Sequence, residues 1–254
     1  MQTDARSLPS FPFPRPLAEG LFVRRVNRFV AEIEVEGSIV RAHVPNTGRM
    51  TELLVAGAPV MLLPRQGAHR KTNHDLLLVQ YNGIWVCTDS REANRVVEDL
   101  LMRLTSGEKL LLPNPDAEIW HILSGLTGFQ REASYEGHRI DFALYRGDNQ
   151  VGLLEVKSVN LVENGTALFP DAPTLRGQRH VDLLHDATLA GTPCHVVFAV
   201  QRSDAERFRP HSERDPAFAA ALSRAAKAGV GIHAFSLDMS PAGAALCRVL
   251  PVRL

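Results

Sequence analysis

The stretch RIDFALYRGDNQVGLLEVKSV, residues 139–159, predicts two strands joined by a Gly-Asp-Asn turn. In a strand, residues i and i+2 point to the same face, so Glu155 and Lys157 share one face of the second strand. A hairpin of the two strands brings the carboxylate of Asp141 beside Glu155, which lies fourteen residues later. The stretch therefore predicts two carboxylates and one lysine at a single place on a sheet.

Two carboxylates this close need a shared proton or cation to offset their repulsion. Two carboxylates about 4 Å apart repel by about 4 kcal/mol at an effective dielectric near 20, unless they share a proton or a cation. Mg²⁺ (or Mn²⁺) fits, because it is a hard ion held by one or two carboxylates, water and phosphate oxygens. The ion would polarise a phosphorus centre and help to ionise an attacking water. Lys157 would orient that water or offset developing charge. The alternative is that Glu155 and Lys157 form a solvent-facing stripe on an edge strand.

The lysine is informative because the chain contains 24 Arg and only 4 Lys. A basic group needed only for its charge would be expected to be Arg in this composition. Two helices bring further polar groups near the strands: Glu98 lies on the helix that precedes them, and Gln178 on the helix that follows.

Residues 90–254 predict an α/β domain with a mixed sheet covered on both faces, because helices and strands alternate along them. We expect helices over residues 91–104, 117–124 and 178–189, a helix capped by Asp215-Pro216 and ended near Gly229, and strands over 139–145, 151–159, 195–200, 230–239 and 244–252.

Residues 17–89 predict a small all-β domain, and residues 1–16 an extended, Pro-rich lead-in. Strand signals occur at Phe22-Val23 and over residues 29–35, 39–44, 60–63, 76–81 and 84–88, with Asn82-Gly83 as a hairpin turn. With Phe22-Val23 and residues 29–35 counted as one strand, five short strands in about 70 residues suit an oligonucleotide/oligosaccharide-binding (OB) barrel.

Composition narrows the functional classes. The 254 residues carry 28 basic and 28 acidic side chains, and 45% of them are hydrophobic, which argues against disorder and against a membrane bundle. Three cysteines without a CxxC predict a reducing, cytoplasmic setting. Zero net charge gives no support for a nucleic-acid partner, although residues 1–88 carry a net charge of +3 and the remainder −3.

Five segments resemble those of the sugar fermentation stimulation protein A (SfsA) family. They are HVPNTGRM (43–50), RIDF (139–142), EVKSV (155–159), LFPDAPTLRGQRH (168–180) and VQRSD (200–204), and the similarity extends in order over roughly residues 16–252. The resemblance implies an N-terminal OB-like barrel and a C-terminal domain with the restriction-endonuclease-like PD-(D/E)xK fold. It also implies DNA binding without strong sequence preference and a regulatory role in maltose metabolism.

The resemblance also implies roles for individual residues. Asp141, Glu155 and Lys157 fill the acid, acid and lysine positions of the superfamily, Gln178 resembles the helix glutamine of some branches, and Glu98 would be the helix acid. The predicted catalytic residues are therefore Asp141, Glu155, Lys157 and Gln178, and the predicted metal ligands are Asp141, Glu155 and Glu98.

Candidate DNA contacts are basic or loop residues: Arg24, Arg25, Asn46, Thr47, Arg49, Arg176, Arg179 and His180. The backbone of residues 46–49 could grip a phosphate, although a tight loop that needs Gly48 explains the same sequence. Solvated strand faces or salt bridges explain the arginines equally well. Aromatic side chains could stack on bases, whereas core packing is the expectation for most of Phe22, Phe29, Tyr81 and Trp85.

Three functions compete. The leading hypothesis is a DNA-binding protein with a Mg²⁺-dependent nuclease-type site, and the second is a non-catalytic DNA-binding regulator with a vestigial nuclease fold. The third, a small-molecule enzyme, is disfavoured because the chain has neither GxGxxG nor GxxxxGK[ST]. We expect no membrane partner, and the sequence leaves both a monomer and a homodimer open.

Overall fold

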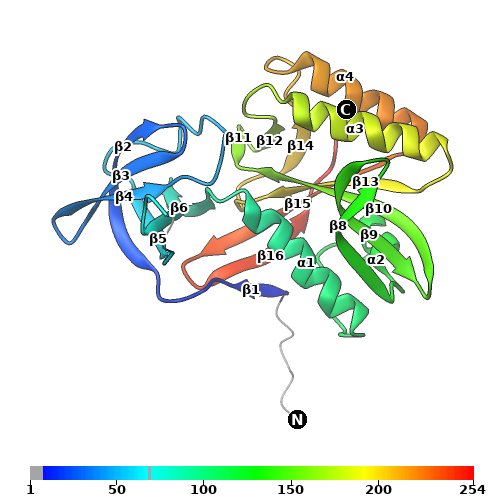
Figure 1. The fold of residues 1–254 in the computed structure, drawn as a ribbon, viewed down its shortest axis with the longest axis horizontal. Coiled ribbons are helices and arrows are strands. Elements are labelled where there is room, and N and C mark those ends of the chain that lie inside the picture. Colours follow the sequence, from blue (N-terminus) through cyan, green and yellow to red (C-terminus); the bar gives the residue numbers. More distant parts are fainter. Residues whose placement is uncertain (1–7, 68–69) are drawn as a thin grey trace, which may run out of the picture.

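The computed structural model describes residues 8–67 and 70–254. Five strands near the N-terminus close into a barrel: β2 (Ala18–Asn27), β3 (Val30–Val35), β4 (Ser38–His43), β5 (Pro59–Pro64) and β6 (His74–Tyr81). Their order is β4-β3-β2-β5-β6, and a short parallel pairing of β4 with β6 closes the ring. Buried side chains such as Phe22, Ile33 and Leu62 fill its interior. The predicted OB-like barrel is confirmed (Figure 1).

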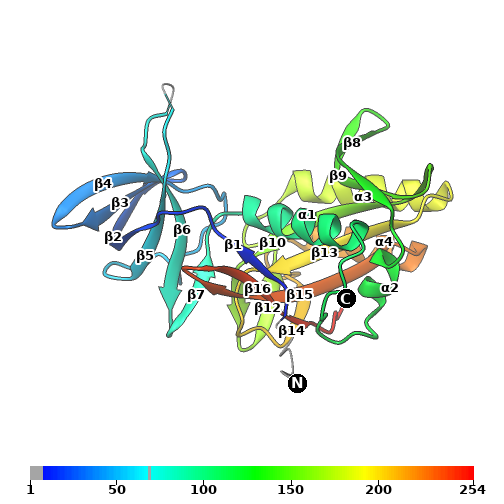
Figure 2. The same cartoon turned by 90° about the horizontal axis from the view of Figure 1, so that it is seen from below.

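The next strand leaves the barrel. The predicted hairpin at Asn82-Gly83 is confirmed: Tyr81 pairs with Ile84, and both turn residues have positive φ (48° and 81°), as a type I′ turn requires. Beyond this turn, β7 (Ile84–Cys87) also pairs with β15 (Gly231–Ser240) of the second sheet through Trp85 and Met239. One path of strands thus runs from the barrel into the larger sheet (Figure 2).

The larger sheet is mixed, as predicted. Three neighbouring strands are parallel: β15, β13 (Cys194–Val200) and β10 (Asn149–Val159). Next to β10 lies β9 (His138–Arg146), which is antiparallel to it, and β8 (Gly128–Tyr135) pairs with β9 in the same antiparallel way. On the other side of β15, β16 (Gly243–Val249) pairs with β1 (Ser10–Pro12). The described end of the predicted lead-in is therefore a strand of this sheet, and residues 1–7 lie outside the described residues.

Helices cover both faces of the larger sheet. The core on one face includes side chains of α1 (Arg91–Thr105) and α2 (Glu118–Leu123), and the core on the other includes those of α3 (Leu175–Leu189) and α4 (Pro216–Ala228). A small sheet of β11 (Leu161–Glu163), β12 (Thr166–Phe169) and β14 (Arg207–Pro210) lies beside them. No helix in the described part of the chain is long and apolar enough to cross a lipid bilayer.

The two faces of β10 set the position of the site. Leu154 and Val156 pack into the core under α1, while Leu153 and Val159 pack into the core under α3 and α4. Because side chains alternate along a strand, Glu155 faces the α3 side of the sheet. Helix α3 begins three residues before the predicted start, because the Thr174 side chain accepts a hydrogen bond from the Gly177 N–H and caps it.

Candidate active site

The predicted acid pair converges. Asp141 on β9 and Glu155 on β10 lie on neighbouring antiparallel strands, and the Asp141 N–H donates to Glu155 Oε2 at 3.4 Å. Lys157 Nζ lies 2.5 Å from Glu155 Oε1, and the two side chains are only 11% and 3% exposed. The alternative of a solvent-facing stripe on an edge strand is therefore wrong, because β10 lies between β9 and β13.

Each carboxylate is held by its own donors. Asp141 Oδ1 accepts from Asn94 Nδ2 of α1 at 2.7 Å, and Asp141 Oδ2 accepts from the Val156 N–H at 2.8 Å. Glu155 Oε1 accepts from Lys157 and from the ring nitrogen Nδ1 of His180 on α3. Helices from opposite faces of the sheet thus fix the two acids, and the geometry is organised before any ligand binds.

Burial and charge move the two pKa values apart. Burial, followed by the nearby charge of Glu155, raises the pKa of Asp141 to about 6. Burial also acts to raise the pKa of Glu155, but the positive charge of Lys157 and the hydrogen bond from His180 outweigh it and lower that pKa to about 2. At neutral pH both groups are ionised, which is the protonation state that a cation site requires.

The oxygen atoms of this pair suit a hard divalent cation. Glu155 Oε2 accepts only the long bond from the Asp141 N–H, so it keeps lone pairs for a ligand. Burial is the largest cause of the raised pKa of Asp141, and a bound cation would offset this penalty on the ionised form. Among residues 8–67 and 70–254, no three His, Cys, Asp or Glu side chains form a metal-binding group. Water or phosphate oxygens would complete the coordination, as Mg²⁺ commonly requires.

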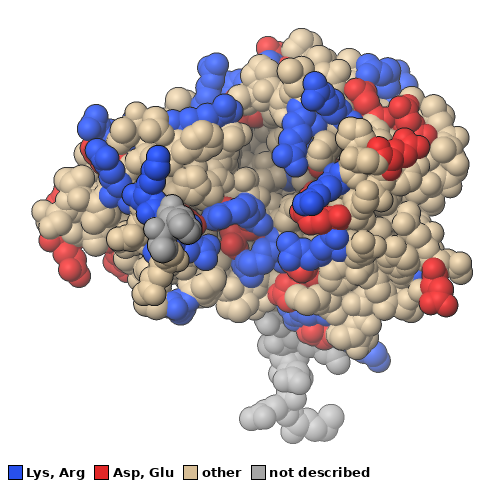
Figure 3. All heavy atoms as spheres, viewed as in Figure 1, with Lys and Arg blue, Asp and Glu red and all other residues tan. Residues whose placement is uncertain are grey.

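The acid pair lines a cavity of about 740 Å³ that the barrel also lines. Arg28, Phe29 and His43 come from the barrel, whereas Asp141, Glu155, Lys157 and His180 come from the larger sheet and α3. Figure 3 shows the face between the two parts hollowed near its middle, with Lys and Arg side chains around the hollow. The barrel and the acid pair are thus two walls of one space.

The loop of residues 46–49 forms part of the barrel wall. Arg25 donates to the carbonyl oxygens of Asn46, Gly48, Arg49 and Arg28 at 2.7–3.2 Å, so its guanidinium braces this loop from within. A side chain at Gly48 would lie 2.8 Å from the Asp171 carboxylate. Arg25 and Gly48 therefore have the architectural function that the tight-loop alternative describes.

The remaining candidates divide by position. Asn46, Thr47 and Arg176 line the cavity together with His180. Arg24 pairs with Glu32 at 2.8 Å on the barrel surface, and Glu98 pairs with Arg131 at 2.9 Å. Residues 24, 49, 98, 178 and 179 are not among those that line the cavity. The roles predicted for these five residues remain predictions.

Two residues contact the acid pair in ways that sequence reasoning did not assign. Asn94, which binds Asp141, lies one helical turn before Glu98 on α1. His180 binds Glu155, and its predicted contact with DNA stays a prediction. It lies two residues beyond Gln178, which is partly buried on α3.

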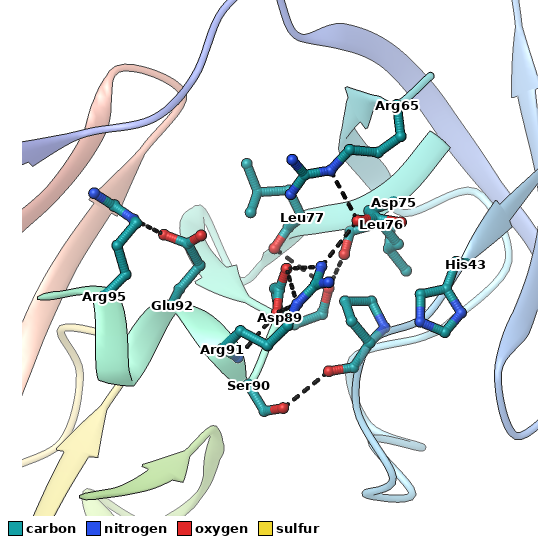
Figure 4. Close-up of polar contacts among 12 residues, drawn as sticks. His43, Arg65, Asp75, Leu76, Leu77, Asp89, Ser90, Arg91, Glu92 and Arg95 are labelled. Carbon is teal, nitrogen blue, oxygen red and sulfur yellow. Dashed lines mark hydrogen bonds and ion pairs between the residues drawn. The ribbon is translucent and has the colours of Figure 1, made fainter. Parts of the chain in front are cut away.

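A polar cluster joins the barrel to the start of α1 beside the cavity (Figure 4). Ser90 Oγ donates to the Pro45 carbonyl oxygen at 2.9 Å, and Arg91 Nη2 lies 2.8 Å from Asp75 on β6 and 2.6 Å from Asp89. This cluster sets the position of the cavity's barrel wall relative to its acidic wall.

Comparisons with known proteins cover both parts of the chain. Residues 23–88 match a family profile described as the SfsA N-terminal OB domain, and residues 91–243 match one described as the sugar fermentation stimulation protein RE domain. A sugar fermentation stimulation protein homolog of Natranaerobius thermophilus is 43% identical over 95% of this chain and 96% of its own. A homolog of the same description from Acetivibrio thermocellus is 40% identical over 93% and 96%.

A solved structure agrees with these matches. The structure of Pyrococcus furiosus SfsA, described as a complex with Ca²⁺, superposes with a TM-score of 0.83 at 29% identity, covering 98% of this chain and 100% of that one.

Proposed function

This chain belongs to the sugar fermentation stimulation protein family, and from that premise we propose that it is a DNA-binding protein without strong sequence preference that hydrolyses phosphodiester bonds in a divalent-metal-dependent reaction. The observation that carries the proposal is the convergence of Asp141, Glu155 and Lys157 in a cavity that the barrel also lines. Acids of this kind beside a basic wall suit a phosphate-bearing polymer.

In this proposal, different residues bind the metal ion, offset charge on the phosphate and position the acids. Asp141 and Glu155 would hold Mg²⁺ or Mn²⁺, which when bound would neutralise phosphate charge and increase the acidity of a bound water. Lys157, 2.5 Å from Glu155, offsets negative charge that develops on the phosphate as water adds and the leaving oxygen departs. Asn94 and His180 keep the acids in position. The Ca²⁺ complex of the Pyrococcus furiosus relative supports a hard-cation site, because Ca²⁺ also prefers oxygen ligands.

A second candidate is a non-catalytic DNA-binding regulator of sugar metabolism, a link that the relatives' name suggests, with maltose as the sugar. One observation favours it: Glu155 Oε1 already accepts from both Lys157 and His180, so a neutralised acid could stand without a metal. The two candidates share DNA binding and differ in catalysis.

Glu155→Gln separates them. We expect wild-type protein to cut labelled single-stranded, duplex or branched DNA with Mg²⁺ or Mn²⁺ and to stop when a chelator is added. Glu155→Gln removes one of the two acid ligands, and we expect it to cut at least about 100-fold more slowly while its Kd for DNA changes by less than about twofold. Gel assays measure cutting, and fluorescence anisotropy in chelator measures binding.

Glu213→Gln is the matched control, because it neutralises another acid that pairs with Arg209 and does not line the cavity. This control should cut like wild type. If wild-type protein cuts none of the three DNA forms with either metal, the non-catalytic candidate is correct. If DNA affinity does not fall steeply with salt, phosphate contacts do not dominate and both candidates fail.

A further inference from the structure

Phe29 occupies a position that core packing does not explain. It lies in the two-residue turn between β2 and β3, where its N–H donates to Asn27 Oδ1 at 2.9 Å, and 46% of the residue is exposed. Phe22 is 2% exposed in the barrel core, Tyr81 lies beneath the guanidinium of Arg202, and Trp85 packs on the larger core. Phe29 is therefore the one of these four aromatics with a large exposed surface.

The neighbours of Phe29 present it as a platform. The His43 ring is stacked on it, with centroids 6.4 Å apart and planes inclined by 24°, and His43 Nδ1 is hydrogen-bonded to the Phe29 carbonyl oxygen at 3.0 Å. The Arg28 guanidinium lies 6.0 Å from the Phe29 ring centroid. All three side chains line the cavity that holds Asp141 and Glu155. Two stacked rings and a cation are thus in the same space as the acid pair.

We propose that Phe29, His43 and Arg28 form a binding platform for an unpaired nucleobase, so that the substrate class of the site is single-stranded or locally unpaired nucleic acid. This inference rests on the proposed function. Aromatic rings stack on the face of any base, and an arginine beside the ring adds a cation–π contribution. Inside a duplex both faces of each base are already stacked on neighbouring bases, so only the two end pairs of a duplex could reach the platform.

The charges around the cavity fit this ligand. Arg91, Arg139 and Arg176 line it together with Arg28, and they can follow the phosphates of a strand whose base is stacked on Phe29. OB barrels also use the loop between their first two strands for nucleic-acid binding, and Phe29 lies in that loop. The platform therefore gives the site a preference for unpaired over paired nucleic acid, and the arginines give it affinity for the phosphate backbone.

The test compares Phe29→Ala with wild type for binding one mixed-sequence DNA oligonucleotide and its blunt duplex, by fluorescence anisotropy in chelator so that no cutting occurs. Loss of one stacked base should weaken binding of the single strand about tenfold and binding of the duplex less than twofold. Phe29→Trp should restore single-strand affinity to within about twofold. Ile39→Ala is the control, because Ile39 is an exposed apolar residue of the barrel (57%) that does not line the cavity.

Each outcome is decisive. Equal losses for both DNA forms, no loss for either form, or a loss with Ile39→Ala as large as with Phe29→Ala would overturn the platform while leaving the proposed function standing. If wild-type protein binds neither form, the proposed function fails and this inference fails with it. Because Phe29 is on an exposed turn, Phe29→Ala should keep the wild-type circular dichroism spectrum, which verifies that lost binding is not lost folding.

Discussion

Asp141 and Glu155 are neighbouring acids with opposite pKa shifts, and the difference has a consequence for stability. The pKa of Asp141 is raised from 3.8 to about 6, so the folded chain holds a proton there that the unfolded chain has released between these pH values. The contribution of Asp141 to stability is therefore fully present below pH 3.8 and is lost as pH rises through 6. At neutral pH this acid destabilises the metal-free protein.

Asp141→Asn should therefore stabilise the protein at pH 8 in chelator. A shift of this size corresponds to about 3 kcal/mol at most, and the gain should shrink as pH falls toward 5. Asn94 can turn its amide over to bind the new side chain, so the hydrogen bond need not be lost. Urea unfolding at several pH values measures the effect.

Asp148→Asn is the control for that experiment, because Asp148 is exposed in the β9–β10 turn. It should change stability by less than about 0.5 kcal/mol at every pH. An Asp141→Asn variant that is less stable than wild type at pH 8 would contradict the idea that this acid is strained by burial and by Glu155.

At the residue scale, strand geometry made the convergence of the two acids and the lysine predictable from the sequence. The helix residues that contact the acids depend on tertiary packing and were not predicted. Glu155 and Lys157 share a face because of the two-residue period of a strand, and the hairpin brings Asp141 to them. Which residue of α1 or α3 reaches the acids depends on the rotation of each helix against the sheet. Asn94 and His180 therefore could not be distinguished from their neighbours by spacing alone.

At the scale of elements, capping residues gave reliable signals. The predicted cap at Asp215 is confirmed: its Oδ1 accepts from the Phe218 N–H at 3.0 Å, and Gly229 ends α4 with a φ of 106°. Asp215 does more than the sequence indicated, because its Oδ2 also accepts from the N–H of Thr174 at 2.8 Å. One buried carboxylate thus holds the starts of both α3 and α4.

Asp215→Ala should lower stability by about 2 kcal/mol, because it removes the cap of α4 and leaves the Thr174 N–H without its partner. Asp215→Asn should recover part of the loss, since asparagine also caps helices. Thermal unfolding measures both. Glu213→Ala serves as the comparison, because Glu213 is 61% exposed and forms a surface ion pair with Arg209. A loss with Asp215→Ala no larger than with Glu213→Ala would refute the double cap.

Elements without a local signal were missed. β8 pairs only with β9 and is mostly exposed, so its sequence lacks the alternation of apolar and polar residues that reveals a half-buried strand. β1 lies in a Pro-rich segment, yet Phe11 is fully buried and pairs with Ala244 near the other end of the chain. Pairings across such a separation are not encoded in neighbouring residues.

At the scale of the whole molecule, the cavity depends on how the barrel is held against the larger sheet. Asp75 on β6 is fully buried and is bound by Arg65 at 3.0 Å and by Arg91 at 2.8 Å (Figure 4). Arg70 also pairs with it. Burial acts to raise the pKa of Asp75, but hydrogen bonds from Arg91, Arg65 and Arg70 outweigh it and lower that pKa. Since Arg91 begins α1, this carboxylate connects the barrel to the rest of the chain.

Asp75→Asn should loosen that connection. The substitution leaves three guanidinium groups around a neutral amide. We expect the free energy of unfolding to fall by about 2–4 kcal/mol. The loss is smaller than for a fully buried ion pair because the arginines are partly exposed. Two probes separate the parts: far-ultraviolet circular dichroism reports the helices, all of which in the described chain lie outside the barrel, and hydrogen exchange of the paired β3 and β4 amides in urea reports the barrel.

In the wild-type protein, the two urea transitions should coincide, because the clamp makes the barrel and the sheet unfold together. Asp75→Asn should move the barrel transition to lower urea than the helical one. Glu32→Gln is the matched control, because Glu32 pairs with Arg24 and Arg41 within the barrel and does not pair with α1. This substitution should lower the free energy of unfolding by less than about 1 kcal/mol, and the two transitions should still coincide. Coincident transitions in Asp75→Asn would show that other contacts, among them the pairing of β7 with β15, suffice to couple the two parts.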